Sequence, residues 1–246
     1  SRFGDFGTVK IKVAEPGQSL NDDLQRVWVV RAAYPDARIR LDANGGYSVD
    51  AAMTIAGAMI ENGVSLDYLE QPVATIAEMA ELKLRLNKAG IGSLQAGGVK
   101  IAADESVRKV SDPLAVAQAG AADLLVVKAA PLGGISRALE IVREAGLPAV
   151  VSSALETSVG ISMGLHLAGA LPESAGAGAN ASQLASGLGT AALLADDVVE
   201  ESLIDRDGFI EVRRVVPSPA RLERLAASPE RRDWWLVRLE RCLRLL

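Results

Sequence analysis

Charged residues close five successive short runs of β-branched and aliphatic residues, and this repeat constrains the fold more than any other feature. The charged residues are 30, 28, 34 and 24 positions apart, about the length of one strand plus one helix. In a strand-helix repeat of this kind the strands run parallel, and the residues at their carboxyl ends meet at one rim of a barrel. The five residues are Lys12, Asp42, Glu70, Asp104 and Lys128. The sequence therefore predicts an α/β barrel with a functional site at that rim.

Seven strand-like segments predict a (β/α)8-type barrel that lacks one strand. Amphipathic segments lie between them, and several end in glycine, as helix C-caps often do. A closed barrel of this type needs eight strands, and only seven residues precede the first segment, so we expect the chain to begin at the second strand of the barrel. The predicted strands cover residues 8–13, 37–43, 65–71, 99–105, 122–129, 148–154 and, with a weaker pattern, 185–190.

The strand-helix alternation divides the chain into two parts. We assign residues 1–199 to the barrel domain, because the repeat stops at about Asp196. Residues 200–246 form a predicted C-terminal extension that packs on the barrel or on a further domain. In its last part, residues 228–246, we expect Trp234 and Trp235 to pack on the protein and the arginines to face water.

Length and composition fit one such domain and exclude several other classes of protein. The chain has 246 residues and a net charge of −5 with scattered Lys and Arg, so no basic face indicates a nucleic-acid partner. No apolar run reaches the roughly 20 residues that a membrane helix needs. The single cysteine, Cys242, excludes an internal disulfide framework and favours a reducing, cytoplasmic location. We expect a small-molecule ligand, and composition predicts no oligomeric state.

Three of the five charged residues are predicted metal ligands. Asp42, Glu70 and Asp104 supply carboxylate oxygens, the ligands that Mg²⁺ prefers, and Mn²⁺ can substitute for it. One aspartate at a strand end is explained by helix capping, but three carboxylates on successive strands would repel one another without a cation between them. Glu105 follows Asp104 directly and should point the other way on a strand, so we expect it outside the ligand set.

The lysines predict proton transfer beside the metal. Lys10 and Lys12 share one face of a strand, and each is expected to lower the pKa of the other. Alternating lysines more often form a solvated strand face, so the pair alone is weak evidence. Lys128 is expected across the ring from Lys12. Two amines that face each other over a metal-bound carboxylate are suited to removing the proton α to that carboxylate and stabilising the enediolate.

The order Lys-x-Lys, Asp-Ala-Asn, Glu-Gln-Pro, Asp-Glu-Ser and Lys resembles the muconate-lactonizing subgroup of the enolase superfamily, whose sites combine a Lys or His base with Mg²⁺. Three stretches narrow the resemblance to the o-succinylbenzoate synthases of the actinobacterial type. Members carry an N-terminal α+β capping domain, which we expect this chain to lack. The stretches are VKIKVAEPGQSL (9–20), KAAPLGG (128–134) and VVSSALETSVG (150–160).

This resemblance implies a dehydration that yields 2-succinylbenzoate for menaquinone biosynthesis. Lys12 would take the α-proton of 2-succinyl-6-hydroxy-2,4-cyclohexadiene-1-carboxylate and then help the hydroxyl leave as water. Lys128 would stay protonated and stabilise the enediolate by its charge and by cation–π contact. Further substrate contacts implied by the resemblance are Lys10, Asn44, Ser152 and Ser153.

Two alternatives remain open from the sequence. N-succinylamino acid racemases and dipeptide epimerases use the same five residues, and a truncated, inactive barrel would keep them too. Other reactive residues are expected to have no chemical role. His166, the only histidine, lies within a predicted helix, and Cys242 lacks partners. The glycine-rich segment 174–182 does not follow a strand, so it is not expected to bind phosphate.

Overall fold

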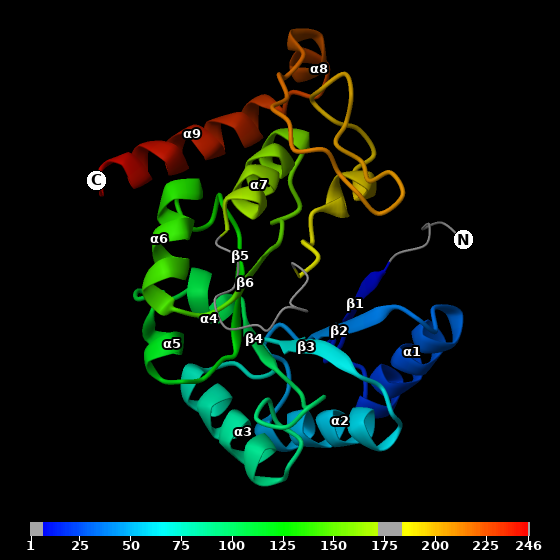
Figure 1. Ribbon diagram of the computed structural model, residues 1–246. Helices are drawn as coiled ribbons and strands as arrows, with labels where there is room; N and C mark the ends of the chain where they lie inside the picture. The colour runs from blue at the N-terminus through cyan, green and yellow to red at the C-terminus, as the bar shows by residue number, and fades with distance from the viewer. Residues whose placement is uncertain (1–6, 172–183, 246) are drawn as a thin grey trace.

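Six parallel strands form one curled sheet in the computed structural model, which describes residues 7–171 and 184–245 (Figure 1). The strands lie side by side in chain order, and each neighbouring pair is parallel. The predicted strand-helix repeat is therefore confirmed for six units, which form a half-barrel. The strands are β1 (Thr8–Lys12), β2 (Arg38–Asp42), β3 (Leu66–Glu70), β4 (Ile101–Ala103), β5 (Leu124–Val127) and β6 (Ala149–Val151).

Helices cover the outer side of the sheet, as the amphipathic segments predict (Figure 1). Local sequence sets their ends: Ser19 and Thr75 form capping boxes with the acidic residues three positions later, and Gly146 ends one helix in the left-handed conformation. The helices of this part are α1 (Leu20–Ala33), α2 (Val49–Glu61), α3 (Ile76–Lys88), α4 (Glu105–Arg108), α5 (Ala115–Gln118), α6 (Ile135–Ala145) and α7 (Ser158–Ala170).

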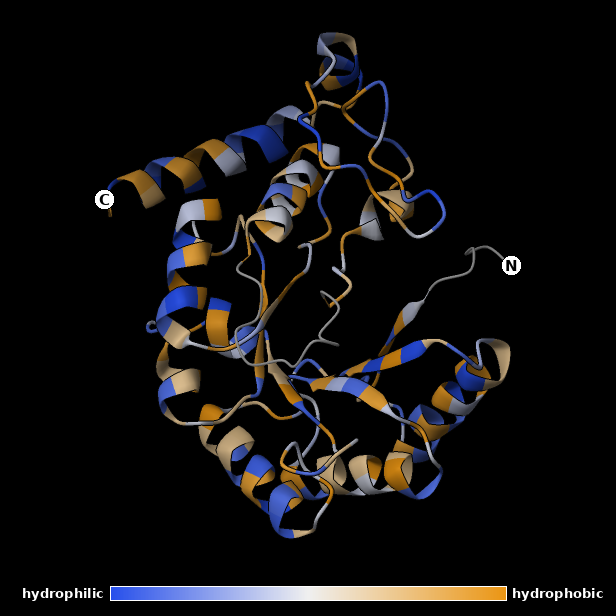
Figure 2. Ribbon diagram, in the orientation of Figure 1, coloured by the Kyte–Doolittle hydropathy of each residue, from blue (hydrophilic) through white to orange (hydrophobic). Residues whose placement is uncertain are grey.

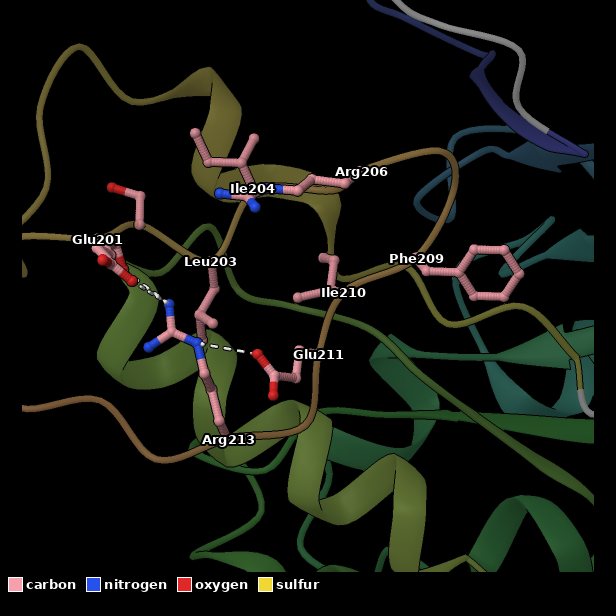
Figure 3. Close-up of a pocket in the computed structure, with 9 residues that line it drawn as sticks. Glu201, Leu203, Ile204, Arg206, Phe209, Ile210, Glu211 and Arg213 are labelled. Carbon is pink, nitrogen blue, oxygen red and sulfur yellow. Dashed lines mark hydrogen bonds and ion pairs between the residues drawn. The ribbon is translucent and has the colours of Figure 1, made fainter.

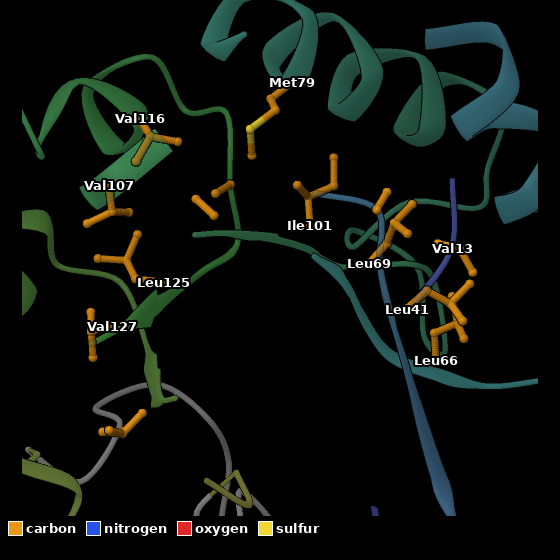
Figure 4. Packing of buried hydrophobic residues seen from close by; sticks show 14 of the residues in the cluster. Val13, Leu41, Leu66, Leu69, Met79, Ile101, Val107, Val116, Leu125 and Val127 are labelled. Atoms are coloured by element: carbon orange, nitrogen blue, oxygen red, sulfur yellow. The ribbon is translucent and has the colours of Figure 1, made fainter. Parts of the chain in front are cut away.

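Alternation along the strands divides the buried residues into two clusters. Leu69 and Leu125 face the helices and belong to the large cluster, together with Met79 of α3 (Figure 4). Their strand neighbours Tyr68 and Leu124 belong to a small cluster on the concave side. Because successive side chains of a strand point to opposite faces, β3, β4, β5 and β6 bury apolar residues on both sides of the sheet. β1 and β2 instead alternate apolar and charged residues (Figure 2).

The predicted seventh strand, residues 185–190, does not form a strand. The segment nevertheless lies where that strand was expected, beside β6. Gly187 donates to Val151 O at 2.8 Å and accepts from the Ser153 N–H at 3.2 Å, which makes one parallel bridge beside β6. The chain then enters a 3-10 helix, η1 (Gly189–Leu193). Two glycines in six residues, without a β-branched run, do not sustain a ladder. Six strands are thus the extent of the sheet in the described residues.

The C-terminal extension ends in two helices, α8 (Pro219–Arg224) and α9 (Pro229–Leu243), neither of which contains a buried residue. Trp234 and Trp235 are 49% and 55% exposed, so neither is buried against the described residues, and the packing of this extension on a further domain stays a prediction. They pack edge to face on each other, with ring centroids 4.7 Å apart, and the Arg238 guanidinium lies against both rings. Within the described parts of the chain, no helix combines the length and apolar composition that crossing a membrane requires.

Candidate active site

The register of the sheet brings three of the predicted residues to one level. Lys12 of β1 lies beside Asp42 of β2, and Asp42 lies beside Glu70 of β3. The next pair is offset: Glu70 lies beside Ala102, so Asp104 stands two residues further along, just past the end of β4. Strand stagger of this kind is inherent in a curled parallel sheet, and it makes the rim rise from β1 to β4.

An ionic cluster joins the ends of β1, β2 and β3. Lys10 Nζ lies 3.0 Å from Asp42 Oδ2 and 2.9 Å from Glu70 Oε2. Lys12 Nζ lies 2.6 Å from Asp42 Oδ2 and donates to Asn44 Oδ1 at 2.6 Å. Both carboxylates are buried, whereas half of the Lys12 side chain is exposed. Lys12 is therefore open to solvent while it contacts the Asp42 carboxylate.

Asp104 and Lys128 form a second, more deeply buried pair. Lys128 Nζ donates to Asp104 Oδ2, and the exposed fractions of the two side chains are 9% and 1%. The other oxygen of Asp104 accepts from Arg108 Nε at 2.7 Å. Gln71 holds the backbone of the same turn, because its Oε1 accepts from the Asp104 N–H at 3.3 Å and from the Ser106 N–H at 3.0 Å. Lys12 and Lys128 thus contact the first and the last carboxylate of the row.

Burial and neighbouring charges shift the ionisation of this cluster. Burial raises the pKa of Glu70 to about 7; Asp42 and Asp104 add to the rise, and Lys10 opposes it. Burial would also raise the pKa of Asp42, but Lys10 and Lys12 outweigh it and lower that pKa. Burial would lower the pKa of Lys10, but Glu70 and Asp42 together raise it. The expected lowering by a neighbouring lysine is therefore wrong for Lys10, because two buried carboxylates act on its ammonium.

The donor set of Asp42, Glu70 and Asp104 fits a hard divalent cation by its chemistry. All donors are carboxylate oxygens, all three side chains are buried, and the first and last of them act on Glu70 by repulsion that a cation would relieve. In the structure each of the three carboxylates contacts a lysine or arginine. The described residues contain no group of three acidic, His or Cys side chains arranged to hold an ion. The ligand assignments therefore stay predictions.

The predicted substrate contacts lie in two places. Asn44 is in the cluster: its backbone is left-handed, with φ 45°, and its side chain lies between Lys12 and Glu105. Ser152 and Ser153 follow β6 instead. The Ser153 hydroxyl lies 2.6 Å from Thr190 Oγ1, and no hydrogen bond among the described residues joins either serine to the lysines. Their role with a substrate stays a prediction.

Several buried or partly buried residues near the cluster were not predicted from the sequence. Arg40 stands two residues before Asp42 on the same face of β2, is buried, and stacks on Tyr68 at 4.7 Å. The period of two along a strand could have found it. Gln71 and Arg108 lie beyond the ends of their strands, where no periodicity points to them. Glu105, expected on a strand, begins helix α4 instead.

The remaining predictions concern residues away from the rim. His166 lies in α7 as expected, and its Nδ1 is 2.7 Å from Ser162 O, one turn earlier. Cys242 is exposed in α9. The glycine-rich segment 174–182 lies outside the described residues. A hollow of about 370 Å³ opens among residues 201–213, where Arg213 pairs with Glu201 and Glu211 (Figure 3). It contains none of the predicted site residues.

The sequence of this chain is similar to a known protein family and to known enzymes. The model of the family described as Enolase C-terminal domain-like matches residues 2–217. The o-succinylbenzoate synthase of Mycobacterium tuberculosis is 49% identical over all 246 residues, and that of Mycobacterium marinum is 48% identical. The chain spans 68% of the length of each of these relatives.

Solved structures show the same architecture. Muconate lactonizing enzyme from Pseudomonas putida matches with a TM-score of 0.71 at 25% identity, over 91% of this chain and 59% of that enzyme. The chain therefore spans less than two thirds of that structure. The L-Ala-D/L-Glu epimerase from Bacillus subtilis matches with a TM-score of 0.64 at 27% identity, over 79% of this chain and 50% of the epimerase.

Proposed function

Because the chain belongs to the enolase C-terminal domain-like family, we propose that it performs the o-succinylbenzoate synthase reaction, the dehydration of 2-succinyl-6-hydroxy-2,4-cyclohexadiene-1-carboxylate to 2-succinylbenzoate. The identity of 49% to synthases over the whole chain supports this choice of reaction. The contrast between the two lysines carries the assignment within the site: Lys12 is half exposed and Lys128 is buried against Asp104. A dehydration needs only one lysine to move protons.

Lys12 is the base in this proposal. Its neutral amine takes the proton from the carbon that bears the substrate carboxylate, which leaves the electron pair on that carboxylate as an enediolate. The ammonium so formed returns the proton to the hydroxyl at the neighbouring carbon. The C–O bond breaks, water leaves and the ring becomes aromatic, so Lys12 ends neutral, as it began. The proton leaves with the water, so no exchange with solvent is needed between turnovers.

Lys128 keeps its proton in this proposal. Its ammonium donates to the Asp104 carboxylate and supplies a fixed positive charge for the enediolate. Asp42, Glu70 and Asp104 would hold the Mg²⁺ ion, for which Mn²⁺ can substitute. When bound, this ion withdraws charge from the substrate carboxylate and makes the neighbouring proton more acidic. Lys10, Asn44, Ser152 and Ser153 are the proposed contacts to the rest of the substrate.

An isomerase is the second candidate. The fold similarity to the L-Ala-D/L-Glu epimerase favours it, because the proposed lysine pair also suits removal and return of a proton on opposite faces. In that case both lysines must exchange protons, and a buried Lys128 paired with Asp104 is poorly placed to do so. A cytosolic location and a free small-molecule substrate complete the proposal, and the single cysteine agrees with a reducing compartment.

One assay separates these possibilities. The purified protein is given the cyclohexadiene substrate with Mg²⁺, and 2-succinylbenzoate is followed by mass spectrometry; in parallel, N-succinylamino acids are incubated in deuterium oxide. We expect dehydration, with Lys12→Ala inactive. Racemisation with deuterium incorporation but no dehydration would support the isomerase. Failure of both reactions, with the metal bound, would support an inactive barrel.

A further inference from the structure

Polar contacts connect Lys12 to the turn that follows β4. Asn44, in the loop after β2, accepts from Lys12 through Oδ1 at 2.6 Å and donates from Nδ2 to Glu105 Oε1 at 3.3 Å. The Asn44 N–H also donates to Asp42 Oδ1 at 3.1 Å, which fixes the loop to the end of its own strand. Its left-handed backbone, with φ 45°, is a conformation that asparagine tolerates better than most residues. Asn44 is thus a bridge between the proposed base and α4.

Arg108 continues this connection to the other end of the carboxylate row. Its guanidinium donates from a terminal nitrogen to Glu105 Oε1 at 2.6 Å and from Nε to Asp104 Oδ1 at 2.7 Å. Asp104 in turn accepts from Lys128 through Oδ2. A continuous set of contacts therefore runs from Lys12 through Asn44, Glu105, Arg108 and Asp104 to Lys128.

The arginine is suited to this place by its shape. A guanidinium presents donors in a rigid fork and can hold two carboxylates at once, whereas a lysine ammonium is a single point of charge on a flexible stem. The contacts also lie at α4. This helix has only four residues, so its own backbone hydrogen bonds do little to hold Asp104 in place. Only 21% of the Arg108 side chain is exposed, so solvent screens these ion pairs less than pairs on an open surface.

We propose that Arg108 is a positioning residue: it fixes the carboxylate of Asp104 for the metal ion and, through Glu105 and Asn44, fixes the amine of Lys12. This proposal rests on the proposed metal site. It goes beyond that site because it assigns a role to a residue that touches neither substrate nor metal. Outer contacts that orient metal ligands are typically worth 10- to 100-fold in metal affinity.

Whether metal affinity falls or rises in an Arg108 variant distinguishes a positioning role from simple neutralisation of the Asp104 charge. A guanidinium that only neutralised Asp104 would compete with the metal ion, so weakening its hold would leave metal binding unchanged or make it tighter. A guanidinium that orients Asp104 would, when its fork is lost, weaken metal binding even though the charge is kept. Arg108→Lys makes this change, because it retains the positive charge and removes the fork.

The experiment measures Mn²⁺ binding by electron paramagnetic resonance, without substrate. We expect Arg108→Lys to weaken Mn²⁺ binding about 10-fold relative to the unaltered protein. The matched control is Arg85→Lys in α3, because Arg85 also contacts two carboxylates, Asp50 and Glu81, and neither belongs to the proposed site. Arg85→Lys should leave Mn²⁺ affinity unchanged. Unchanged or tighter binding in Arg108→Lys would overturn the proposal.

A second variant keeps the test decisive if Arg108→Lys does not fold. Glu105→Gln preserves size and removes the carboxylate that Arg108 and Asn44 share. We expect Glu105→Gln alone to weaken Mn²⁺ binding, a result that does not need Arg108→Lys. Where Arg108→Lys folds, we expect the double variant to bind no more weakly than Arg108→Lys alone, because both changes break one connection. Full affinity in Glu105→Gln, or additive losses in the double variant, would contradict the proposal.

The metal site itself is tested in the same titration. Asp104→Asn should abolish Mn²⁺ binding if Asp104 is a ligand. An unaltered protein that fails to bind Mn²⁺ would overturn the proposed metal site and the role of Arg108 with it. Normal binding by the unaltered protein, loss in Asp104→Asn and no change in Arg108→Lys would overturn the role of Arg108 alone.

Discussion

Residues 7–171 and residues 214–245 contain similar apolar side chains but use them differently. In the first part, helices α1, α2, α3, α6 and α7 each bury residues against the sheet. In the second, α9 has Trp235, Leu239 and Leu243 on one side, at helical spacing, yet no residue between 214 and 245 is buried. An amphipathic pattern therefore predicts a helix in both parts. It predicts packing only where the rest of the fold supplies an opposing surface.

We predict that all catalytic residues lie in the first part. Removal of divalent ions should have the largest effect on activity. Because Asp42, Glu70 and Asp104 are all in the first part, stripping the protein with a chelator should abolish dehydration. Mg²⁺ or Mn²⁺ should restore it, measured as 2-succinylbenzoate formed before and after addition. Full turnover in excess chelator, or a preference for zinc, would contradict the assignment.

Removal of the proposed base should cost almost as much. Lys12→Ala deletes the proton acceptor, and we expect turnover to fall by about 10²- to 10⁴-fold with the metal still bound. Lys88→Ala, in the last turn of α3, serves as the control and should leave turnover unchanged. At the other end of the row, Lys128→Arg keeps a charge and should retain more activity than Lys128→Ala. Equal losses in these two Lys128 variants would argue against a purely electrostatic role.

A cavity in the core of the first part should lower stability sharply. Leu82 of α3 is fully buried in the large cluster. Leu82→Ala removes its contacts and leaves a space that the packed neighbours cannot fill, so we expect the free energy of unfolding to fall by about 2 to 5 kcal/mol. Chemical denaturation followed by circular dichroism measures this change. A loss below about 1 kcal/mol would show that this core is loosely packed.

The same contrast explains how much of the molecule its sequence could predict. Asp42 and Glu70 could be assigned to one rim because each closes a strand and the strands are parallel, and the register confirms that they lie side by side. The contacts of Arg108 and Gln71 could not be predicted, because they depend on turns beyond the strands, where Gln71 adopts a φ of 36°. Segment 185–190 forms no strand, because two glycines and the lack of a β-branched run do not sustain a ladder and the chain turns into η1.

A substitution in the exposed helix α9 should have the smallest effect on stability. It is also the closest control for the substitution in the buried core. Leu239 of α9 is 55% exposed, so Leu239→Ala makes in the second part the same chemical change that Leu82→Ala makes in the first. Its side chain already contacts water and alanine favours helix, so we expect the free energy of unfolding to change by less than about 0.5 kcal/mol in the same denaturation experiment. A loss comparable to that of Leu82→Ala would show that α9 is packed against another surface in solution. In that event its apolar side chains would belong to a buried interface, and the contrast between the two parts would no longer hold.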